Sequence, residues 1–260
     1  MKTINTILLP AILLLALGAA PDSAHAIGEF SLGINAGVTY APNNIDDTVN
    51  RYNDTLKYWA AANPGADVEQ INVPYAPVLG FNVRYQFNFF LIRFGWHYST
   101  SALSSEGSVT PNGGVKNKIK ISSFQHSLPA TVGLIMPLKK RTFFYIGAGG
   151  TFHMAFVEMT QSNPDQGGVP FNMNTDLGLS DNKRDRYYKE FVGYHLILGA
   201  EVPVTSKFTL SAEWIHQEGR SYPMNNDGED NAGASTSAPK KAINARGDVL
   251  LFGINYYIPI

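Results

Sequence analysis

Eight segments of the chain alternate between apolar residues and small or polar residues. Side chains on a β-strand point alternately to opposite faces, so a period of two predicts strands with one apolar face. From Phe30 to Tyr40, every even position is aromatic or aliphatic, and every odd position is serine, glycine, asparagine or threonine. The predicted strands are Glu29–Tyr40, Leu79–Phe87, Phe90–Tyr98, Lys118–Met136, Phe144–Met154, Val192–Glu201, Phe208–Trp214 and Leu250–Ile258.

The fourth predicted strand changes parity along its length. Its later part has apolar residues at even positions from Leu128 onward, whereas Ile119 and Ile121 are apolar at odd positions. A β-bulge inserts one residue into a strand and exchanges its two faces. We therefore expect a bulge near Ser122 or Ser123.

The connections between these strands alternate in length. Short turns are predicted around Asn88-Phe89, Pro137–Arg141 and Pro203–Lys207. The other connections are polar segments of roughly 20 to 35 residues, far above usual loop lengths. An even number of antiparallel strands, with short turns at one end and long loops at the other, is typical of a barrel in a bacterial outer membrane. The short turns and both chain ends would then lie on the periplasmic side.

The composition of the two faces distinguishes a membrane barrel from a soluble one. The face without large apolar residues is rich in glycine and carries Arg84, Arg93 and Glu213, which suits the crowded interior of an eight-stranded barrel. The apolar face has aromatic residues near both strand ends, such as Phe90 and Tyr98, and two aromatic belts match the interfaces of a bilayer. The sequence therefore predicts an all-β fold: an eight-stranded antiparallel up-and-down transmembrane β-barrel.

The first 26 residues have the pattern of an export signal. Lys2 is followed by an apolar region from Ile7 to Leu17, and Ala24-His25-Ala26 fits the small-x-small rule for cleavage. We expect residues 1–26 to be a signal peptide and residues 27–260 to form the single barrel domain. No other segment reaches the roughly 18 apolar residues that a transmembrane helix needs.

Three stretches carry a resemblance to a known family. They are Tyr145-Ile-Gly-Ala-Gly-Gly, Leu128-Pro-Ala-Thr-Val-Gly-Leu and the aromatic last strand. With the strand and loop pattern, the chain resembles the small eight-stranded outer-membrane barrels of the OmpA, OmpX and OmpW type. The resemblance implies an outer membrane of the Gram-negative kind and insertion by the barrel-assembly machinery. One departure is the end of the chain, Tyr257-Ile258-Pro259-Ile260, where such proteins usually end in Phe or Trp.

Composition excludes several functional classes. The chain has no cysteine, which excludes disulfides, thiolate metal sites and a cysteine nucleophile. Its formal net charge is −1, which gives no basic face for nucleic acid. No sequence motif indicates a cofactor, and none is expected.

A predicted register places charged residues opposite one another inside the barrel. A two-residue turn at Asn88-Phe89 sets Arg84 directly opposite Arg93, which is unfavourable unless partners are present. Glu213, with Glu201 as a further member, supplies the carboxylates for an expected network. The network is either a structural plug or a gate. The same face carries His97, His153 and His195, read as interior hydrogen-bonding histidines rather than as ligands of one metal ion.

The first long loop has the periodicity of an amphipathic helix. Its apolar positions recur at helical spacing, and Asn63-Pro64-Gly65 would end it. The helix either packs on the rim of the barrel or forms a hydrophobic lid for a small apolar ligand, as the resemblance to OmpW-like proteins implies. The candidate lid residues are Ile45, Val49, Tyr52, Leu56 and Trp59.

Basic residues gather where the chain re-enters the strands from the long loops. They are either solvated loop charges or contacts for lipopolysaccharide phosphates, which lysine and arginine suit. The triplet Arg246-Gly247-Asp248 is also an RGD sequence of the type that integrins bind. The candidate lipopolysaccharide contacts are Lys116, Lys118, Lys120, Lys183, Arg184, Arg186, Lys189, Lys240, Lys241 and Arg246.

These observations favour a non-enzymatic protein of the outer membrane with a structural role or with surface contacts to lipid. The alternative is a narrow passive channel for small hydrophobic solutes, with Pro129 as the place where the wall would open. An enzyme that acts on lipid A is a third hypothesis. Against it, His126 and Ser127 are adjacent and point to opposite faces of a strand. The sequence does not fix the oligomeric state.

Overall fold

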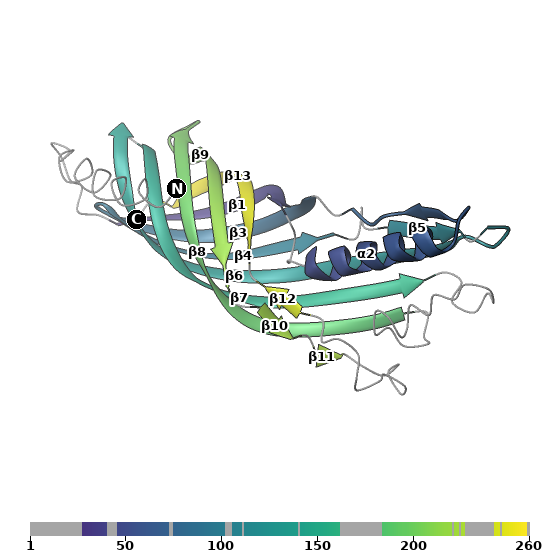
Figure 1. Ribbon diagram of the computed structural model, residues 1–260. Helices are drawn as coiled ribbons and strands as arrows, with labels where there is room; N and C mark the ends of the chain where they lie inside the picture. The colour runs from purple at the N-terminus through teal and green to yellow at the C-terminus, as the bar shows by residue number, and fades with distance from the viewer. Residues whose placement is uncertain are drawn as a thin grey trace, which may run out of the picture.

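Antiparallel strands close into a barrel in the computed structural model, which describes residues 28–40, 46–72, 75–101, 106–110, 112–139, 141–161, 184–219, 221–223, 225–226, 242–244 and 246–258. Each barrel strand pairs with its neighbour in chain order, and β1 pairs with both β3 and β13, which closes the ring (Figure 1). The barrel strands are β1 (Glu29–Tyr40), β3 (Tyr75–Phe87), β4 (Phe90–Thr100), β6 (Asn117–Lys139), β7 (Thr142–Gln161), β8 (Arg184–Pro203), β9 (Phe208–Glu218) and β13 (Gly247–Ile258).

The apolar face of the strands points outward, as the composition of the faces predicts. On β1, Ile34 is 69% exposed, whereas its neighbour Asn35 on the other face is buried. The outward aromatic residues also lie at two levels. On β4, Phe90 and Tyr98 are eight residues apart, about 20 Å along the barrel axis at a strand tilt of about 40°. This separation fits the apolar band of about 25 Å that outer-membrane barrels present to lipid.

The strand registers fix the tilt of the barrel. A row of paired residues that starts at Asp248 on β13 passes once around the barrel through His216, Leu196 and the remaining strands, and it returns to β13 at Ile258. The displacement is ten residues. For eight strands, this corresponds to a tilt of about 40°, within the range of membrane barrels.

Two of the three short turns contain two residues. Phe87 pairs with Phe90, so Asn88 and Phe89 form the turn, and Asn88 has a φ of 52°. This turn gives the predicted register, in which Arg84 pairs with Arg93. The second turn ends at Arg141, which has a φ of 56°.

Three strands continue far beyond the length that a bilayer requires. β6, β7 and β8 contain 23, 20 and 20 residues. At about 3.3 Å per residue and a tilt of about 40°, 23 residues rise about 58 Å, roughly twice the apolar band. The alternation predicts shorter strands, because the ends of these strands do not separate apolar from polar residues cleanly. The part of β6 beyond its pairing with β4, residues 117–123, and its neighbours in residues 157–161 of β7 and 184–187 of β8 are called the extension below.

The predicted bulge in β6 is wrong. The register between β6 and β7 is continuous from Ile119 to Pro137, and it shifts only between Pro137 and Lys139. Ile121 therefore points to the inner face, where it is buried. The parity of the sequence changes because the inner face of the extension buries apolar residues, whereas the inner face of the barrel proper is mostly polar.

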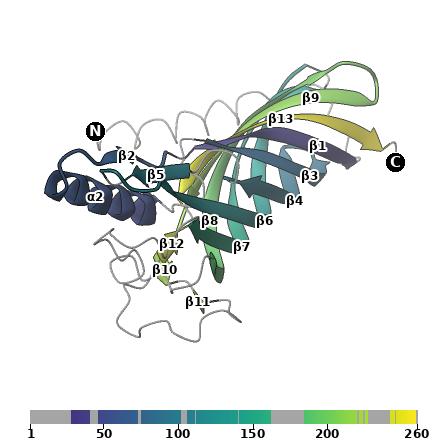
Figure 2. The same ribbon diagram turned by 90° about the vertical axis from the view of Figure 1, so that its right-hand side faces the viewer.

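The long connections contain a helix and short strands at the open end of the barrel. Figures 1 and 2 show α2 and the β2–β5 pair at the end opposite to the one where β13 finishes. The pair β2–β5 continues the sheet beside β6, while β11 pairs with β8 and β10 pairs with β12. These elements are α2 (Asp46–Ala62), β2 (Asp67–Glu69), β5 (Glu106–Thr110), β10 (Ser221–Pro223), β11 (Asn225–Asn226) and β12 (Ala242–Asn244).

The predicted loop helix is present as α2, and it is fastened to the segment that follows β2. The side chain of Asn53 donates a hydrogen bond to the carbonyl of Ile71 at 2.8 Å and accepts one from its N–H at 2.9 Å. Asn63-Pro64-Gly65 follows the last residue of the helix as predicted, with Gly65 at a φ of 90°. No helix in the described part of the chain is long and apolar enough to cross a membrane.

Candidate functional site in the barrel lumen

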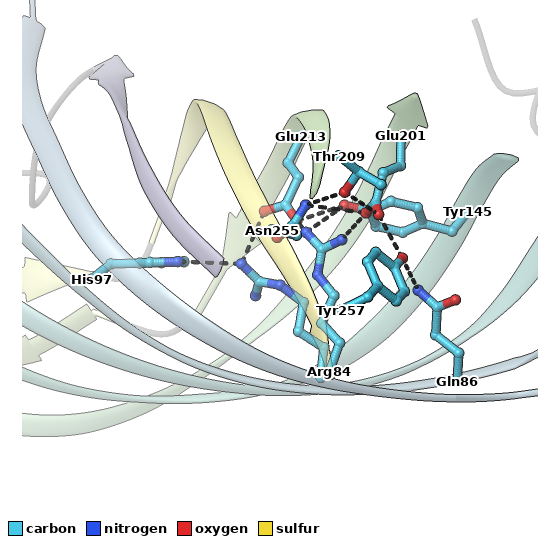
Figure 3. A network of polar contacts seen from close by, with 10 residues as sticks. Arg84, Gln86, His97, Tyr145, Glu201, Thr209, Glu213, Asn255 and Tyr257 are labelled. Carbon is cyan, nitrogen blue, oxygen red and sulfur yellow. Dashed lines mark hydrogen bonds and ion pairs between the residues drawn. The ribbon is translucent and has the colours of Figure 1, made fainter. Parts of the chain in front are cut away.

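Two arginines and two glutamates meet inside the barrel. Arg84 on β3 contacts Glu201 at 2.5 Å and also pairs with Glu213, so one guanidinium holds both carboxylates. Arg93 on β4 donates to the second oxygen of Glu213 at 2.9 Å. The strands β3 and β4 face β8 and β9 across the barrel, so these side chains span the lumen (Figure 3). All four residues are those that the sequence placed in a lumen charge network.

Neutral polar side chains complete the network. Tyr145 on β7 donates to Glu213 at 2.5 Å, and Tyr257 on β13 donates to Glu201 at 2.5 Å. Thr209 also donates to Glu201, again at 2.5 Å, and the amide of Asn255 donates to the other oxygen of that carboxylate at 3.2 Å. Sequence reasoning missed these partners, because each lies on a different strand from the glutamate that it contacts and meets that glutamate only through the fold of the barrel.

The charged side chains of the network are buried, and their positive and negative charges balance. Both arginine side chains are 0% exposed, and Glu201 and Glu213 are also buried. A buried ion costs several kcal/mol to desolvate, unless opposite charges and hydrogen bonds replace the lost water. Two guanidinium groups against two carboxylates give no net charge. The arrangement therefore places a neutral cluster of charged side chains in the lumen at the level of residues 84 and 93.

The three predicted lumen histidines lie on the inner face but bind different partners. His97 contacts Arg93 at 3.4 Å. His195 lies between the hydroxyls of Thr131 and Thr151, at 2.8 Å from each. Among the described residues, no group of three or more potential ligand side chains is arranged to hold a metal ion.

His153 forms a second small cluster nearer the extension. Its Nδ1 lies 2.7 Å from the amide nitrogen of Gln125 and 2.9 Å from the hydroxyl of Ser127. His126, by contrast, points outward and stacks with Trp96, their ring centroids 5.7 Å apart. Adjacent residues on β6 therefore do point apart, as the sequence predicts, and Ser127 meets a histidine from another strand. That pairing was not predicted, because it depends on the β6–β7 register.

A second arginine contact lies at the end of the barrel with the short turns. Arg141, in the β6–β7 turn, contacts Glu29 at the start of β1 at 3.0 Å and donates to the carbonyl of Ser206 in the β8–β9 turn. Its guanidinium also lies over the ring of Tyr257, at 4.7 Å from the centroid. One side chain thus links three separate segments across this end of the barrel.

The candidate lid is packed against the rest of the protein where its side chains are described. Val49 and Leu56 on α2 are buried, with Leu56 0% exposed. Tyr52 and Trp59 lie on α2, but the structure does not describe their side chains, and Ile45 lies outside the described residues. The two described residues therefore support the interpretation that the apolar stripe packs on the protein itself.

The candidate lipopolysaccharide contacts that the structure describes lie on strands near the open end. Lys116 pairs with Glu69 at 3.6 Å, and Lys118 pairs with Glu106 at 2.8 Å. Lys120 is exposed on β6, and Lys189 lies on β8. The side chains of Arg184 and Arg186 on β8 are not described. Lys183, Lys240 and Lys241 lie outside the described residues.

Both charged residues of the RGD triplet contact side chains of the neighbouring strand. Arg246 contacts Glu218 at 2.8 Å. Asp248 contacts His216 at 2.9 Å, and Gly247 between them starts β13. These contacts are with the neighbouring strand β9, so the triplet is part of the strand pairing at the rim.

The closed barrel, its outward apolar face and its two aromatic levels define an integral outer-membrane β-barrel protein. A family model described as the outer membrane protein beta-barrel domain matches residues 10–238. The chain therefore belongs to the outer membrane protein β-barrel family and is located in the outer membrane.

Solved structures with a similar fold have little sequence identity to this chain. The outer membrane protein OprG from Pseudomonas aeruginosa is 11% identical with a TM-score of 0.49, and the match covers 91% of this chain and 99% of OprG. The neisserial surface protein NspA is 12% identical with a TM-score of 0.43, and the match covers 88% of this chain and 96% of NspA. No curated protein matches the chain in sequence.

Proposed function

We propose that the protein is a non-enzymatic outer-membrane barrel whose role lies on its extracellular side, in contacts with surface lipid. The extension is the observation that carries this proposal. β6, β7 and β8 continue for about twice the length that the apolar band requires. An extension of this size, with the β2–β5 pair continuing its sheet, serves no purpose in spanning the bilayer.

The buried charge network in the lumen supports the same proposal. Arg84, Arg93, Glu201 and Glu213 occupy the interior at one level, and side chains fill an eight-stranded barrel. We therefore expect no ion conductance from the protein in planar bilayers. The Ser127–His153 pair does not argue for hydrolysis, because it is buried inside the barrel, where a lipid substrate has no access.

The proposed lipid partner is lipopolysaccharide, bound through lysines at the start of β6. Lys116 and Lys118 are exposed, and exposed ion pairs are worth only about 0–1 kcal/mol, so phosphate can replace their carboxylate partners. The test replaces Lys116, Lys118 and Lys120 together by Gln and measures lipopolysaccharide that co-purifies with the protein. Lys57→Gln on α2 is the control, because Lys57 is also exposed and paired with a carboxylate. Equal retention by the triple variant and the control would contradict the proposal.

A second candidate function, a lateral route for small hydrophobic solutes, is supported by one feature of the wall. Pairing between β4 and β6 stops after Phe94 and Ala130 and resumes at His97 and Ser127, and Pro129 lies in the interval. Proline has no N–H to donate to the neighbouring strand. Pro129→Ala restores that donor. If the route operates here, the variant takes up a fluorescent hydrophobic solute into vesicles more slowly than the wild type, whereas equal rates would reject the route.

We also propose that export removes residues 1–26 and that the barrel-assembly machinery inserts residues 27–260. A positively charged residue, an apolar stretch and small residues follow one another before Ile27, and this order supports the boundary. N-terminal sequencing of protein from outer-membrane fractions tests it. A first residue other than Ile27 would contradict the boundary.

A further inference from the structure

Asparagine and glycine alternate on the inner face of four adjacent strands, both along each row of paired residues and from one row to the next. One row of paired residues runs through Asn255 on β13, Gly33 on β1, Asn82 on β3 and Gly95 on β4. The next row toward the extension contains Gly253, Asn35, Gly80 and His97 in the same strand order. Asn35, Asn82 and Asn255 are called the amide track below.

The glycines allow these amides to lie flat against the wall and to approach one another. A Cβ atom added to Gly33 would lie 2.2 Å from Oδ1 of Asn255 and 2.7 Å from Nδ2 of Asn82, so both amides occupy the space over this glycine. A Cβ atom added to Gly80 would likewise lie 2.7 Å from Oδ1 of Asn35. The track is therefore a continuous polar surface rather than three separate side chains.

Many polar atoms along this surface have no hydrogen-bond partner among the described residues of the protein. They are both amide atoms of Asn35, Oδ1 of Asn82, Oδ1 of Asn255, the hydroxyl of Ser31, and Nε and Nη1 of Arg93. A buried polar atom without a hydrogen-bond partner destabilises the fold, because it has lost its bonds to water and gained none in return. Seven such atoms on one surface indicate that a partner beyond the described residues binds there.

The chemistry of the atoms identifies that partner. The amide oxygens of Asn82 and Asn255 require a donor, whereas Nη1 of Arg93 and Nδ2 of Asn35 require an acceptor. A metal ion supplies no donor and is repelled by the guanidinium, and a simple anion supplies no donor either. Water both donates and accepts, and buried water typically makes about three hydrogen bonds to such groups.

The polar surface continues from the amide track toward the open end of the barrel. Arg93 contacts His97 at 3.4 Å, and beyond it lie the polar clusters around His195 and His153. In the His153 cluster, Nε2 of His153 and Oε1 of Gln125 are also buried without a partner among the described residues. At the opposite end, Ser31 pairs with both Tyr257 and Arg84 in the register. Asn255 lies two residues before Tyr257 on β13 (Figure 3).

We propose that the amide track binds a string of water molecules and gives the barrel a permeability to water, while the charge network excludes ions. A cation that follows the string meets the guanidinium groups of Arg84 and Arg93, and an anion meets the carboxylates of Glu201 and Glu213. Each ion would also lose its hydration in the lumen, which is unfavourable. Water carries no net charge and exchanges one hydrogen-bond partner for another along the track.

The test measures osmotic shrinkage of proteoliposomes by stopped-flow light scattering. We expect wild-type vesicles to shrink several-fold faster than protein-free vesicles and to show no ion conductance. The variant Asn35→Leu/Asn82→Leu keeps the side-chain size and removes the polar atoms, so it should shrink at the protein-free rate. The control Ile197→Leu, on the facing wall at β8, should behave as the wild type. Wild-type vesicles no faster than protein-free ones, or an equally fast double variant, would overturn the proposal.

Two further measurements keep the test decisive if the double variant folds poorly. A heat-dependent shift on a gel establishes that the variant forms a barrel. Nuclear Overhauser effects between water and the side-chain amides of Asn35 and Asn82, recorded on the wild type in nanodiscs, test the bound water directly. Absence of these signals from assigned amides overturns the proposal whatever the variant does. The surface role proposed above has separate readouts, so failure of one does not imply failure of the other.

Discussion

The two lumen arginines should differ in their contribution to stability, although they are cross-strand neighbours and equally buried. Arg84 pairs with both Glu201 and Glu213 and also contacts the hydroxyl of Tyr145 at 3.2 Å. Arg93 pairs with Glu213 alone among the carboxylates of the described residues. The same substitution, arginine to methionine, therefore removes different numbers of bonds at two matched positions.

The expected loss of unfolding free energy depends on which partners each substitution leaves without an ion pair. Arg84→Met leaves Glu201 with no cationic partner among the described residues, and breaking a buried ion pair in this way typically costs about 3–5 kcal/mol. Arg93→Met leaves Glu213 still bonded to Arg84 and Tyr145, so we expect the loss of about one charged hydrogen bond, roughly 1.5–3 kcal/mol. We therefore expect Arg84→Met to be the more damaging change by about 2 kcal/mol.

Reversible urea unfolding of the protein in lipid vesicles measures this difference. Tryptophan fluorescence reports unfolding, since Trp96 and Trp214 lie on the outward face of the barrel, and the heat-dependent gel shift reports the folded fraction. The slope with urea should stay constant between the variants, because the surface exposed on unfolding is the same. Equal losses for the two variants, or a larger loss for Arg93→Met, would refute the assignment of Arg84 as the centre of the network.

Three further predictions concern the wall, the helix and the tip of the barrel. Gly199→Ala should destabilise the barrel by about 1–3 kcal/mol in the same urea assay, because its Cβ would lie 2.2 Å from the ring of Tyr145; Gly150→Ala, with its nearest atom 3.9 Å away, should not. Asn53→Ala should increase hydrogen exchange in residues 46–72 and leave the barrel strands protected, since it removes both bonds to Ile71; unchanged exchange would contradict that role. The hydrogen bond from Lys118 holds the pKa of Glu106 below its ordinary value, so the pair is lost only as pH falls through that lowered pKa; Lys118→Gln should raise the pKa of Glu106 in an NMR titration.

The alternation of the sequence predicted the parts of the fold that depend on local geometry. Side-chain direction has a period of two along any strand, so the pattern in β1 or β4 identifies the outward face without knowledge of the neighbours. The two-residue turn at Asn88-Phe89 likewise fixed the pairing of Arg84 with Arg93, because the register of a hairpin follows from its turn.

The parts that the sequence did not predict depend on relations between distant strands. Tyr145 and Tyr257 complete the charge network, but they meet the glutamates only because the register shifts by ten residues around the barrel. The false bulge near Ser122 has a similar origin. The inner face of β6 carries Gln125, Ser127 and Thr131 within the barrel but Ile121 in the extension, and parity alone cannot distinguish a change of environment from a change of register.

The interior is best understood as neighbouring strands whose side chains are complementary in size. A long side chain on one strand lies over a glycine on the paired strand: Tyr145 lies over Gly199, and the amides of Asn82 and Asn255 meet over Gly33. A barrel of eight strands has a fixed diameter for a given register shift, so a large residue at one position requires a small one at the position that it reaches. The glycines that first suggested a crowded lumen are therefore set by the polar network itself. An alanine at such a position should disturb hydrogen bonds on a neighbouring strand before it disturbs its own strand.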